Sequence, residues 1–283
     1  MNPRTKAEFF LFSITFIWGS TFVISKYLLG YFTPLVYIGI RFSIAALLFS
    51  LIFFRQIKTL SKGAAIKGGI LGALLFTGFA AQTIGLQYTS ASKSAFITGM
   101  LVVFTPICQL IIERRPPKVG NIIGVVLVII GLYLLTSPAG SEFNVGDALS
   151  LLCAFMFGLY IVYLDVFSKD HDTAQLTFMQ FVATAVLGFA GAGLFERVAV
   201  QVGTEPLLAL AYLIVFATVI ALYIQTRYQK DTTPTRSAII FSIEPVIAAG
   251  FAYVALGEII GILGVIGGGF IVAGLLVSEL SPA

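Results

Sequence analysis

Two ionisable side chains, Arg41 and Glu244, fall deep inside apolar stretches of the sequence. An ionisable group near the middle of a membrane helix costs about 2.5–3.5 kcal/mol, so it usually faces the protein interior or water. With a rise of about 1.5 Å per residue, Arg41 is expected about 10 Å from the outer end of its stretch, and Glu244 about 14 Å from the inner end of its own. In a hydrocarbon core of about 30 Å their levels differ by only about 6 Å, which permits a direct or water-bridged pair.

Each of these residues has a chemical and a structural interpretation. Glu244 can bind a ligand amine or a coupling proton in a central cavity; alternatively, it braces a kink at Pro245 or neutralises Arg41. Arg41 can hold a ligand carboxylate through a bidentate hydrogen bond, or it is a structural residue. The sequence leaves both pairs of alternatives open.

Aromatic and polar residues in the same stretches are candidates for a cavity wall. Trp18 is the only tryptophan and lies near mid-span; Phe22 follows one turn later on the same face, with the hydroxyls of Ser20 and Thr21 nearby. An aromatic wall with a few polar groups suits a small amphipathic ligand, although aromatic residues at this spacing are also typical of core packing. The other polar residues that can line a cavity, or bond a neighbouring helix instead, are Gln82, Tyr160, Gln180 and Gln225.

Two mid-span prolines are candidates for hinges. Proline has no N–H, so Pro106 and Pro245 cannot complete the helix bonds to Val102 and Phe241. Their matching places in the two halves of the chain predict a paired hinge. A static bend in each helix is the alternative.

The elements that carry these residues are predicted from composition. Of the 283 residues, 58% are hydrophobic and 11% are charged, whereas a soluble domain has about a quarter charged residues. The composition therefore excludes a soluble domain and a disordered chain. A span needs about 20 apolar residues. The chain offers ten such segments: Phe9–Leu29, Pro34–Phe54, Ile66–Leu86, Ser92–Ile112, Val119–Leu135, Gly146–Phe167, Ala174–Phe195, Pro206–Tyr228, Thr235–Ala255 and Gly261–Val277.

The charges of the connections predict the orientation. Lysine and arginine collect on the cytoplasmic side of membrane proteins. With ten spans, one side receives Arg4, Lys6, Arg55, Lys58, Lys62, Lys67, Arg114, Arg115, Lys118, Lys169, Arg227, Lys230 and Arg236. The other side receives Lys26, Lys93 and Arg197, together with the acidic Glu142, Asp147, Glu196, Glu205 and Glu258. Both termini are therefore predicted to be cytoplasmic, and charge sorted in this way does not indicate nucleic-acid binding.

Motifs of cofactor and hydrolytic chemistry are missing from the sequence. Cys108 and Cys153 lie in apolar runs and are expected to be packed thiols, and His171 is the only histidine. No GxxxxGK[ST], HExxH or GxSxG pattern occurs. We therefore predict no cofactor, no metal and no enzymatic activity.

An internal repeat is indicated by residues that match after a shift of 139 positions. The shift places Trp18-Gly19 on Phe157-Gly158, Arg41 on Gln180 and Pro106 on Pro245; a shift of 143 places Gly124…Gly131-Leu132 on Gly267…Gly274-Leu275. Chance matching among apolar helices is the alternative. A true repeat predicts two five-helix halves, 1–139 and 140–283, of opposite orientation. Such halves hold a binding site near the midplane and permit alternating access.

The chain resembles the EamA-type branch of the drug/metabolite transporter superfamily, a group of ten-helix carriers. The resemblance rests on Trp18-Gly19-Ser20-Thr21-Phe22 with Lys26, on Arg41-Phe42, on Thr89 through Ala91, Lys93 and Ala95 to Pro106, and on Thr233-Pro234-Thr235 through Glu244-Pro245 to Gly257-Glu258. One departure is Phe157-Gly158-Leu159-Tyr160, which replaces the small polar residues of the first span. The resemblance implies export of small metabolites such as amino acids.

Taken together, these features predict an all-α membrane protein that acts as a secondary transporter. We expect it in a bacterial inner membrane, carrying amino acids or similar zwitterions by alternating access. A sugar-phosphate or nucleotide-sugar translocator ranks lower, because only Arg41 is a deep cation. A membrane-embedded enzyme and a non-transporting receptor or scaffold are weaker alternatives. The expected partners are a small-molecule substrate and the lipid bilayer. GxxxG pairs also permit a homodimer, at Gly68/Gly72, Gly120/Gly124, Gly257/Gly261 and Gly264/Gly268.

Overall fold

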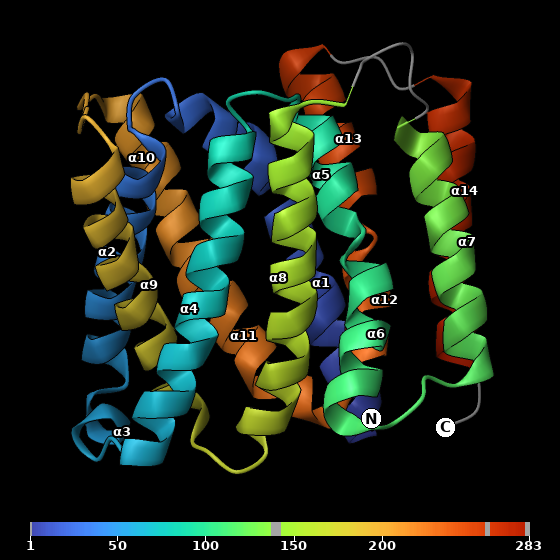
Figure 1. The fold of residues 1–283 in the computed structure, drawn as a ribbon, viewed down its shortest axis with the longest axis horizontal. Coiled ribbons are helices and arrows are strands. Elements are labelled where there is room, and N and C mark those ends of the chain that lie inside the picture. The colour runs from blue at the N-terminus through green and yellow to red at the C-terminus, as the bar shows by residue number, and fades with distance from the viewer. Residues whose placement is uncertain (1, 137–142, 258–260, 281–283) are drawn as a thin grey trace.

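The computed structural model describes residues 2–136, 143–257 and 261–280, and this part of the chain is helical (Figure 1). The predicted boundary between the halves, after residue 139, lies outside the described residues, as do Glu142 and Glu258. The first seven helices are α1 (Pro3–Leu28), α2 (Pro34–Ile52), α3 (Phe54–Lys58), α4 (Lys62–Gly85), α5 (Ala91–Gly99), α6 (Leu101–Glu113) and α7 (Val119–Thr136). The others are α8 (Val145–Ser168), α9 (Thr173–Phe195), α10 (Thr204–Tyr212), the π-helix η1 (Leu213–Ile220), α11 (Ala221–Tyr228), the short η2 (Gln229–Asp231), α12 (Pro234–Phe241), α13 (Glu244–Leu256) and α14 (Ile262–Leu280).

Eight helical segments of the described residues are long and apolar enough to cross a membrane. They are α1, α2, α4, α5 with α6, α8, α9, α10 through η2, and α12 with α13. Two further apolar helices, Val119–Leu134 and Ile262–Ser278, are shorter. They belong to α7 and α14, where the fifth and tenth spans are predicted. The chain is thus an all-helical protein with eight candidate spans, and a count of ten stays a prediction.

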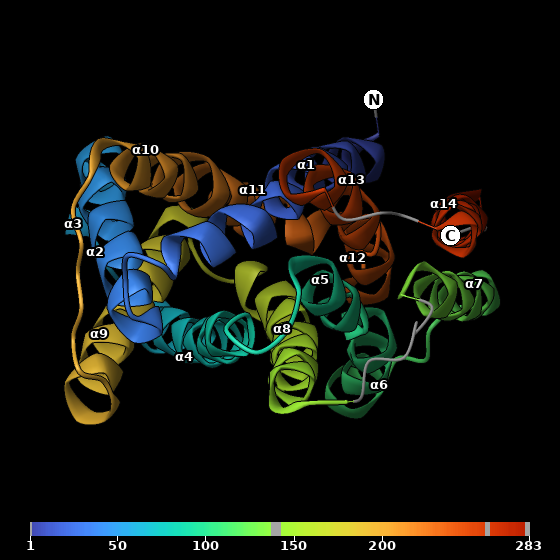
Figure 2. The same ribbon diagram turned by 90° about the horizontal axis from the view of Figure 1, so that it is seen from above.

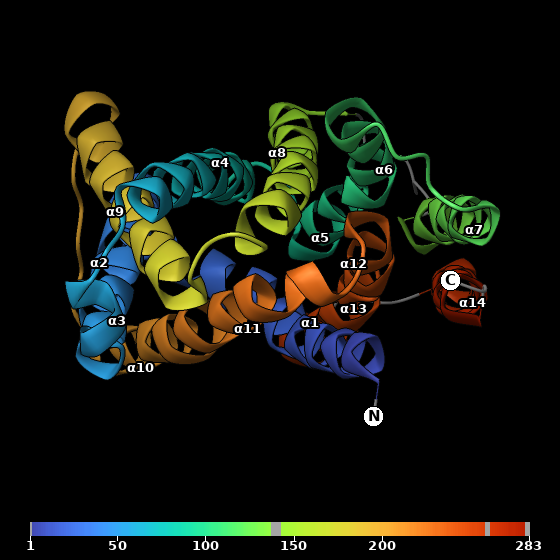
Figure 3. The same ribbon diagram turned by 90° about the horizontal axis from the view of Figure 1, so that it is seen from below.

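The helices are arranged as one bundle when seen along their axes (Figures 2 and 3). α2, α3 and α9 lie at one end, and α7 and α14 form a separate pair at the other end (Figure 2). Aromatic side chains fill the space between α2, α4 and α9, where Phe42 packs against Phe79 at 5.3 Å and Phe181 at 6.0 Å between ring centroids. Large apolar side chains such as Leu51 and Leu194 face outward, which suits contact with lipid tails.

Two of the candidate spans are broken near their middle. α5 ends at Gly99 and α6 begins at Leu101, with Met100 between them. α12 ends at Phe241 and α13 begins at Glu244. Pro245 in the first turn of α13 explains the second break, because it has no N–H to donate to Phe241. The other predicted hinge residue, Pro106, lies inside α6, whereas the break of its span falls earlier, at Met100.

Glycines allow α7 and α14 to approach each other closely. A Cβ atom added to Gly274 would lie 2.7 Å from the carbonyl oxygen of Gly124, and one added to Gly124 would lie 2.8 Å from the carbonyl oxygen of Gly274. These residues belong to the two glycine pairs that the shift of 143 matches. By contrast, the Gly68/Gly72 pair packs against α9 of the same chain. Contacts between copies are therefore not needed to explain that motif, and the homodimer stays a prediction.

We expect Gly274→Ala to destabilise the protein by about 1–3 kcal/mol, because the added methyl group overpacks the backbone of α7. Gly269→Ala is the matched control on the same helix, since no atom lies within 4 Å of its added Cβ. Alanine is the better helix former, so Gly269→Ala should leave the stability unchanged or raise it slightly. Melting temperatures in mild detergent would test this pair. Equal values for the two variants would contradict the close contact between α7 and α14.

Candidate functional site

A cavity lies inside the bundle, beside both helix breaks. Apolar side chains with a few polar groups line it, which is the usual lining of small-molecule sites. Leu101 follows the first break, and Phe241 and Glu244 flank the second. The lining residues are Trp18, Thr21, Arg41, Leu75, Phe79, Gln82, Thr98, Leu101, Phe157, Tyr160, Ile161, Leu222, Gln225, Phe241 and Glu244.

Arg41 supplies the positive charge of the cavity. Its side chain is held by two hydrogen bonds, from Nε to Thr218 Oγ1 (2.7 Å) and from Nη1 to the hydroxyl of Tyr37 (3.0 Å). The guanidinium carbon also lies 5.1 Å from the centre of the Phe79 ring, within cation–π range. Only 2% of Arg41 is exposed, although it lines the cavity. Within the described residues these bonds use two of the five N–H donors of a guanidinium, which leaves others for a ligand.

The π-helix η1 carries Thr218, which contacts Arg41, and Ala217, which contacts Trp18. Thr218 Oγ1 accepts from Arg41 and donates to the carbonyl oxygen of Leu213, five residues earlier (2.8 Å). Trp18 Nε1 donates to the carbonyl oxygen of Ala217 (3.1 Å), which fixes the indole at the cavity wall. π-helical turns are rare in proteins as a whole, but those that do occur often lie at functional sites. Here the widened turn supplies acceptors to both Arg41 and Trp18.

Glu244 supplies the negative charge of the cavity. It is the first residue of α13, where the helix dipole favours a carboxylate. The side chain is half-buried and faces the cavity. Within the described part of the chain, no hydrogen bond or ion pair engages its carboxylate, and none joins it to Arg41. The direct pair that the sequence permits is therefore not formed in this structure, and the opposite charges line one cavity separately.

Of the other polar residues of the lining, Gln82 and Tyr160 are held by neighbouring helices, whereas Gln225 is not. Gln82 Nε2 donates to Thr98 Oγ1 (3.3 Å). The hydroxyl of Tyr160 donates to Gln180 Oε1 (2.7 Å). Gln225 Oε1 is buried without a hydrogen-bond partner among the described residues. Because an unpaired buried oxygen costs free energy, Gln225 is an available acceptor for a donor on a bound ligand.

The structure brings together seven of the ten residues that the sequence suggests for binding. Ser20 lies outside the lining and shares a hydrogen bond with the hydroxyl of Tyr212 (3.0 Å). Phe22 packs in a separate small apolar cluster with Leu86. Gln180 supports Tyr160 from behind. The seven that line the cavity are Trp18, Thr21, Arg41, Gln82, Tyr160, Gln225 and Glu244.

Sequence reasoning missed the other half of the lining, which is mostly apolar. The sequence contained a signal for two of the missed residues, Phe79 and Phe157. Phe79 lies three residues before Gln82 and therefore on the same helix face, and Phe157 is the residue that the predicted repeat matches to Trp18. The missed residues are Leu75, Phe79, Thr98, Leu101, Phe157, Ile161, Leu222 and Phe241.

Known proteins resemble this chain over nearly its full length. The model of the EamA-like transporter family matches residues 5–137 and again 144–280. An uncharacterized transporter of Archaeoglobus fulgidus is 33% identical over 258 residues, which are 91% of this chain and 80% of that protein. The uncharacterized transporter YyaM of Bacillus subtilis is 27% identical over 92% of this chain and 89% of its own length.

A solved crystal structure has the same fold. Its TM-score with this chain is 0.81, and the superposition covers 98% of this chain and 97% of the other. The sequence identity is 19%. At that identity the likeness concerns the fold alone.

Proposed function

Because this chain belongs to the EamA-like transporter family, we propose that it is a secondary transporter that exports small organic metabolites by alternating access. The general function, transport across a membrane, follows from the family and from the transporters that this chain resembles. The proposed substrates are amino acids or similar zwitterions. The proposed location is the bacterial inner membrane, with both termini in the cytoplasm.

The observation that carries the choice of substrate is the pair of opposite charges in one cavity. Arg41 offers donors suited to a carboxylate, and Glu244 offers an acceptor suited to an ammonium group. The rest of the wall is mainly apolar and aromatic, which suits the side chain of an apolar amino acid. A phosphorylated substrate would need more cations. Among the described residues, Lys26 and Lys93 are engaged elsewhere, with Thr89 O and Asp147.

The proposed architecture is ten spans in two five-helix halves of opposite orientation, 1–139 and 140–283. The two successive matches to one family model support it. So do the paired helix breaks, at Met100 and before Glu244. Packing of small residues supports it too, since Gly19 of α1 contacts α13 and Gly158 of α8 contacts α6. In this arrangement each half places its broken span against the first helix of the other half.

Alternating access then requires the halves to move relative to each other around the cavity. We propose that the broken spans absorb this motion, with Pro245 at one break and Pro106 in the helix after the other. Irregular backbone at membrane depth is tolerated where it lines a cavity or is buried in protein, and residues beside both breaks line the cavity.

Transport by purified protein in liposomes tests the proposed function. We expect liposomes that contain the protein and are loaded with unlabelled leucine to take up radioactive leucine by exchange, with no ATP present. A thermal-shift series with amino acids, nucleosides and sugar phosphates should give its largest stabilisation with the amino acids, because a ligand that binds only the folded state raises the melting temperature. Exchange of sugar phosphates without exchange of any amino acid would overturn the choice of substrate.

A further inference from the structure

Two short segments, one in each half, are similar in sequence and begin the two broken spans. Residues 89–95 read Thr-Ser-Ala-Ser-Lys-Ser-Ala, and residues 232–238 read Thr-Thr-Pro-Thr-Arg-Ser-Ala. The shift between them is 143, as for the glycine pairs of α7 and α14. Ser90 caps the start of α5 and Thr233 caps the start of α12, each through a hydroxyl that accepts a backbone N–H.

The first segment makes a polar cluster with the start of α8, which we call the α5–α8 clamp. Lys93 Nζ lies 2.7 Å from Asp147 Oδ2, and Thr89 Oγ1 donates to Asp147 Oδ1 (2.9 Å). Asp147 is fully buried and also accepts from the backbone N–H of Asn144. Lys26 of α1 donates to the carbonyl oxygen of Thr89 (2.6 Å). The cluster therefore joins the broken span of the first half to the first helix of the second.

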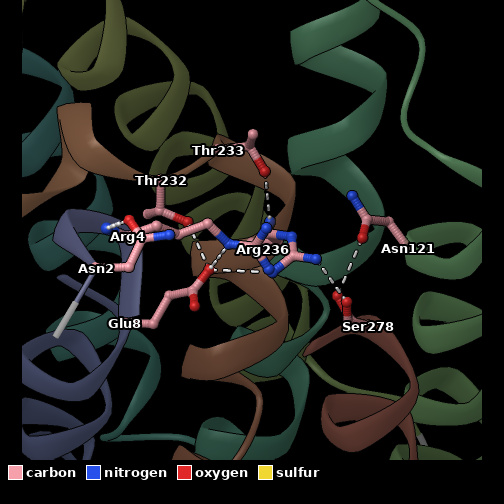
Figure 4. Close-up of polar contacts among 8 residues, drawn as sticks. All are labelled: Asn2, Arg4, Glu8, Asn121, Thr232, Thr233, Arg236 and Ser278. Carbon is pink, nitrogen blue, oxygen red and sulfur yellow. Dashed lines mark hydrogen bonds and ion pairs between the residues drawn. The ribbon is translucent and has the colours of Figure 1, made fainter. Parts of the chain in front are cut away.

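The second segment makes the corresponding cluster with the start of α1, the α12–α1 clamp (Figure 4). Arg236 Nη1 lies 3.1 Å from Glu8 Oε1, and Thr232 Oγ1 donates to the same oxygen (3.2 Å). Glu8 and Arg236 are both buried. Arg4 Nε also donates to Glu8 Oε1 (2.9 Å), and Arg236 Nη2 donates to the carbonyl oxygen of Ser278 on α14 (2.8 Å).

The two acidic partners are equivalent as well. Glu8 plus 139 gives Asp147, which is the shift that also relates Trp18 to Phe157. In each clamp, a basic residue and the threonine four positions before it hold one carboxylate of the opposite half. The α5–α8 clamp lies at the end of the bundle where α5 and α8 begin, and the α12–α1 clamp lies at the end that carries the N-terminus (Figure 1). The cavity lies between the two ends.

We propose that the two clamps are the gates of the transport path, and that Lys93 and Arg236 are positioning residues which hold the cavity closed at opposite faces. Both clamps are formed in this structure. Release of the α5–α8 clamp separates the halves at the face that carries Asp147, and release of the α12–α1 clamp separates them at the face that carries Glu8. Removing one partner of a buried ion pair leaves the other charge uncompensated, so neutralisation favours the open form at that face. The inference rests on the proposed function.

Cysteine labelling of the cavity measures opening at each face without a substrate. Cys108 and Cys153 are replaced by alanine, and Leu222→Cys places a reporter thiol in the lining. A membrane-impermeant maleimide is then added to one face of sealed vesicles at a time. Asp147→Asn and Lys93→Gln should each raise the labelling rate from the Asp147 face by about fivefold or more, a typical coupling between two sites. Glu8→Gln and Arg236→Gln should do the same from the Glu8 face.

Three variants separate gating from general damage. Lys93→Arg keeps the positive charge, so its reporter thiol should be labelled as slowly as in the protein that retains Lys93. Lys93→Gln leaves Asp147 in place in the capping box that it forms with Asn144 at the start of α8, so its effect cannot come from loss of that capping contact. Arg227→Gln removes an ion pair with Asp231 (3.1 Å) that lies within one half, and it should not change labelling from either face. Melting temperatures confirm that each variant is folded.

Two failures have different meanings. Labelling that occurs but is unchanged by all four neutralisations, or that increases from the same face for both clamps, overturns the gates and leaves the proposed transport path standing. A reporter that stays unlabelled from both faces in every folded variant overturns the transport path and the gates with it.

Discussion

Arg41→Ala should lower the affinity for leucine by about 30-fold to several thousand-fold, because truncating one partner of a buried charged contact costs about 2–5 kcal/mol. The guanidinium is already oriented by Thr218 and Tyr37, so a bound carboxylate meets donors that are fixed in place. Binding to the detergent-purified protein, measured by calorimetry, provides the test. Arg41→Lys should recover only part of the affinity, since a lysine cannot donate two parallel bonds.

Ligands that lack one charged group separate a binding role of Arg41 from a structural one. Isoamylamine is leucine without its carboxylate, and its affinity should be nearly the same for Arg41→Ala as for the natural protein. Thr218→Val keeps the charge but removes the acceptor of Nε, so it should weaken leucine binding less than Arg41→Ala does. Arg227→Gln is the matched control and should have no effect. Equal losses for leucine and isoamylamine would show that Arg41 acts on the fold rather than on the carboxylate.

Glu244→Gln should give the complementary result and lower the affinity for leucine to a similar extent. Its carboxylate has no partner among the described residues and faces the cavity, so it is available to an ammonium group. Isocaproate is leucine without its amine, and its affinity should be unchanged or higher in Glu244→Gln. Glu205→Gln, at an exposed residue in the first turn of α10, is the control and should bind like the natural protein.

The other role open to Glu244 is to carry a coupling proton. In that case Glu244→Gln stops leucine uptake driven by a pH gradient while binding and gradient-free exchange of leucine continue. Unchanged binding together with unchanged gradient-driven uptake would exclude both roles. Glu244 would then be a structural residue at the start of α13.

Several parts of the fold follow from local properties of the sequence. Apolar stretches separated by short polar breaks placed every helix that forms a candidate span, and the EamA-type resemblance is confirmed by the match to that family. Arg41, Glu244, Gln82 and Gln225 were found because a polar group in a membrane helix must face the interior. The free-energy cost of placing a polar group in the membrane depends on the residue type and its depth, so it can be judged from the sequence without knowing which helices are neighbours.

Other parts depend on which helices meet. The breaks at Met100 and before Glu244 only partly follow the prolines, because Pro245 lies in the first turn of α13 whereas Pro106 lies inside α6, after the break at Met100. Ser20, Phe22 and Gln180 are as polar or aromatic as the lining residues, but their helices turn them toward Tyr212, Leu86 and Tyr160 instead. Rotation of a helix about its axis is set by its neighbours.

The sequence alone therefore determined that the chain is a bundle of membrane helices of one family with a cation and a carboxylate at depth, since hydropathy and desolvation cost act on each segment separately. Only the tertiary structure decided that Arg41 and Glu244 line one cavity without touching, and that Lys93 and Arg236 reach the carboxylates of Asp147 and Glu8. Those relations join residues that are distant along the chain. They arise from packing between helices, where a turn of one helix about its axis changes every partner.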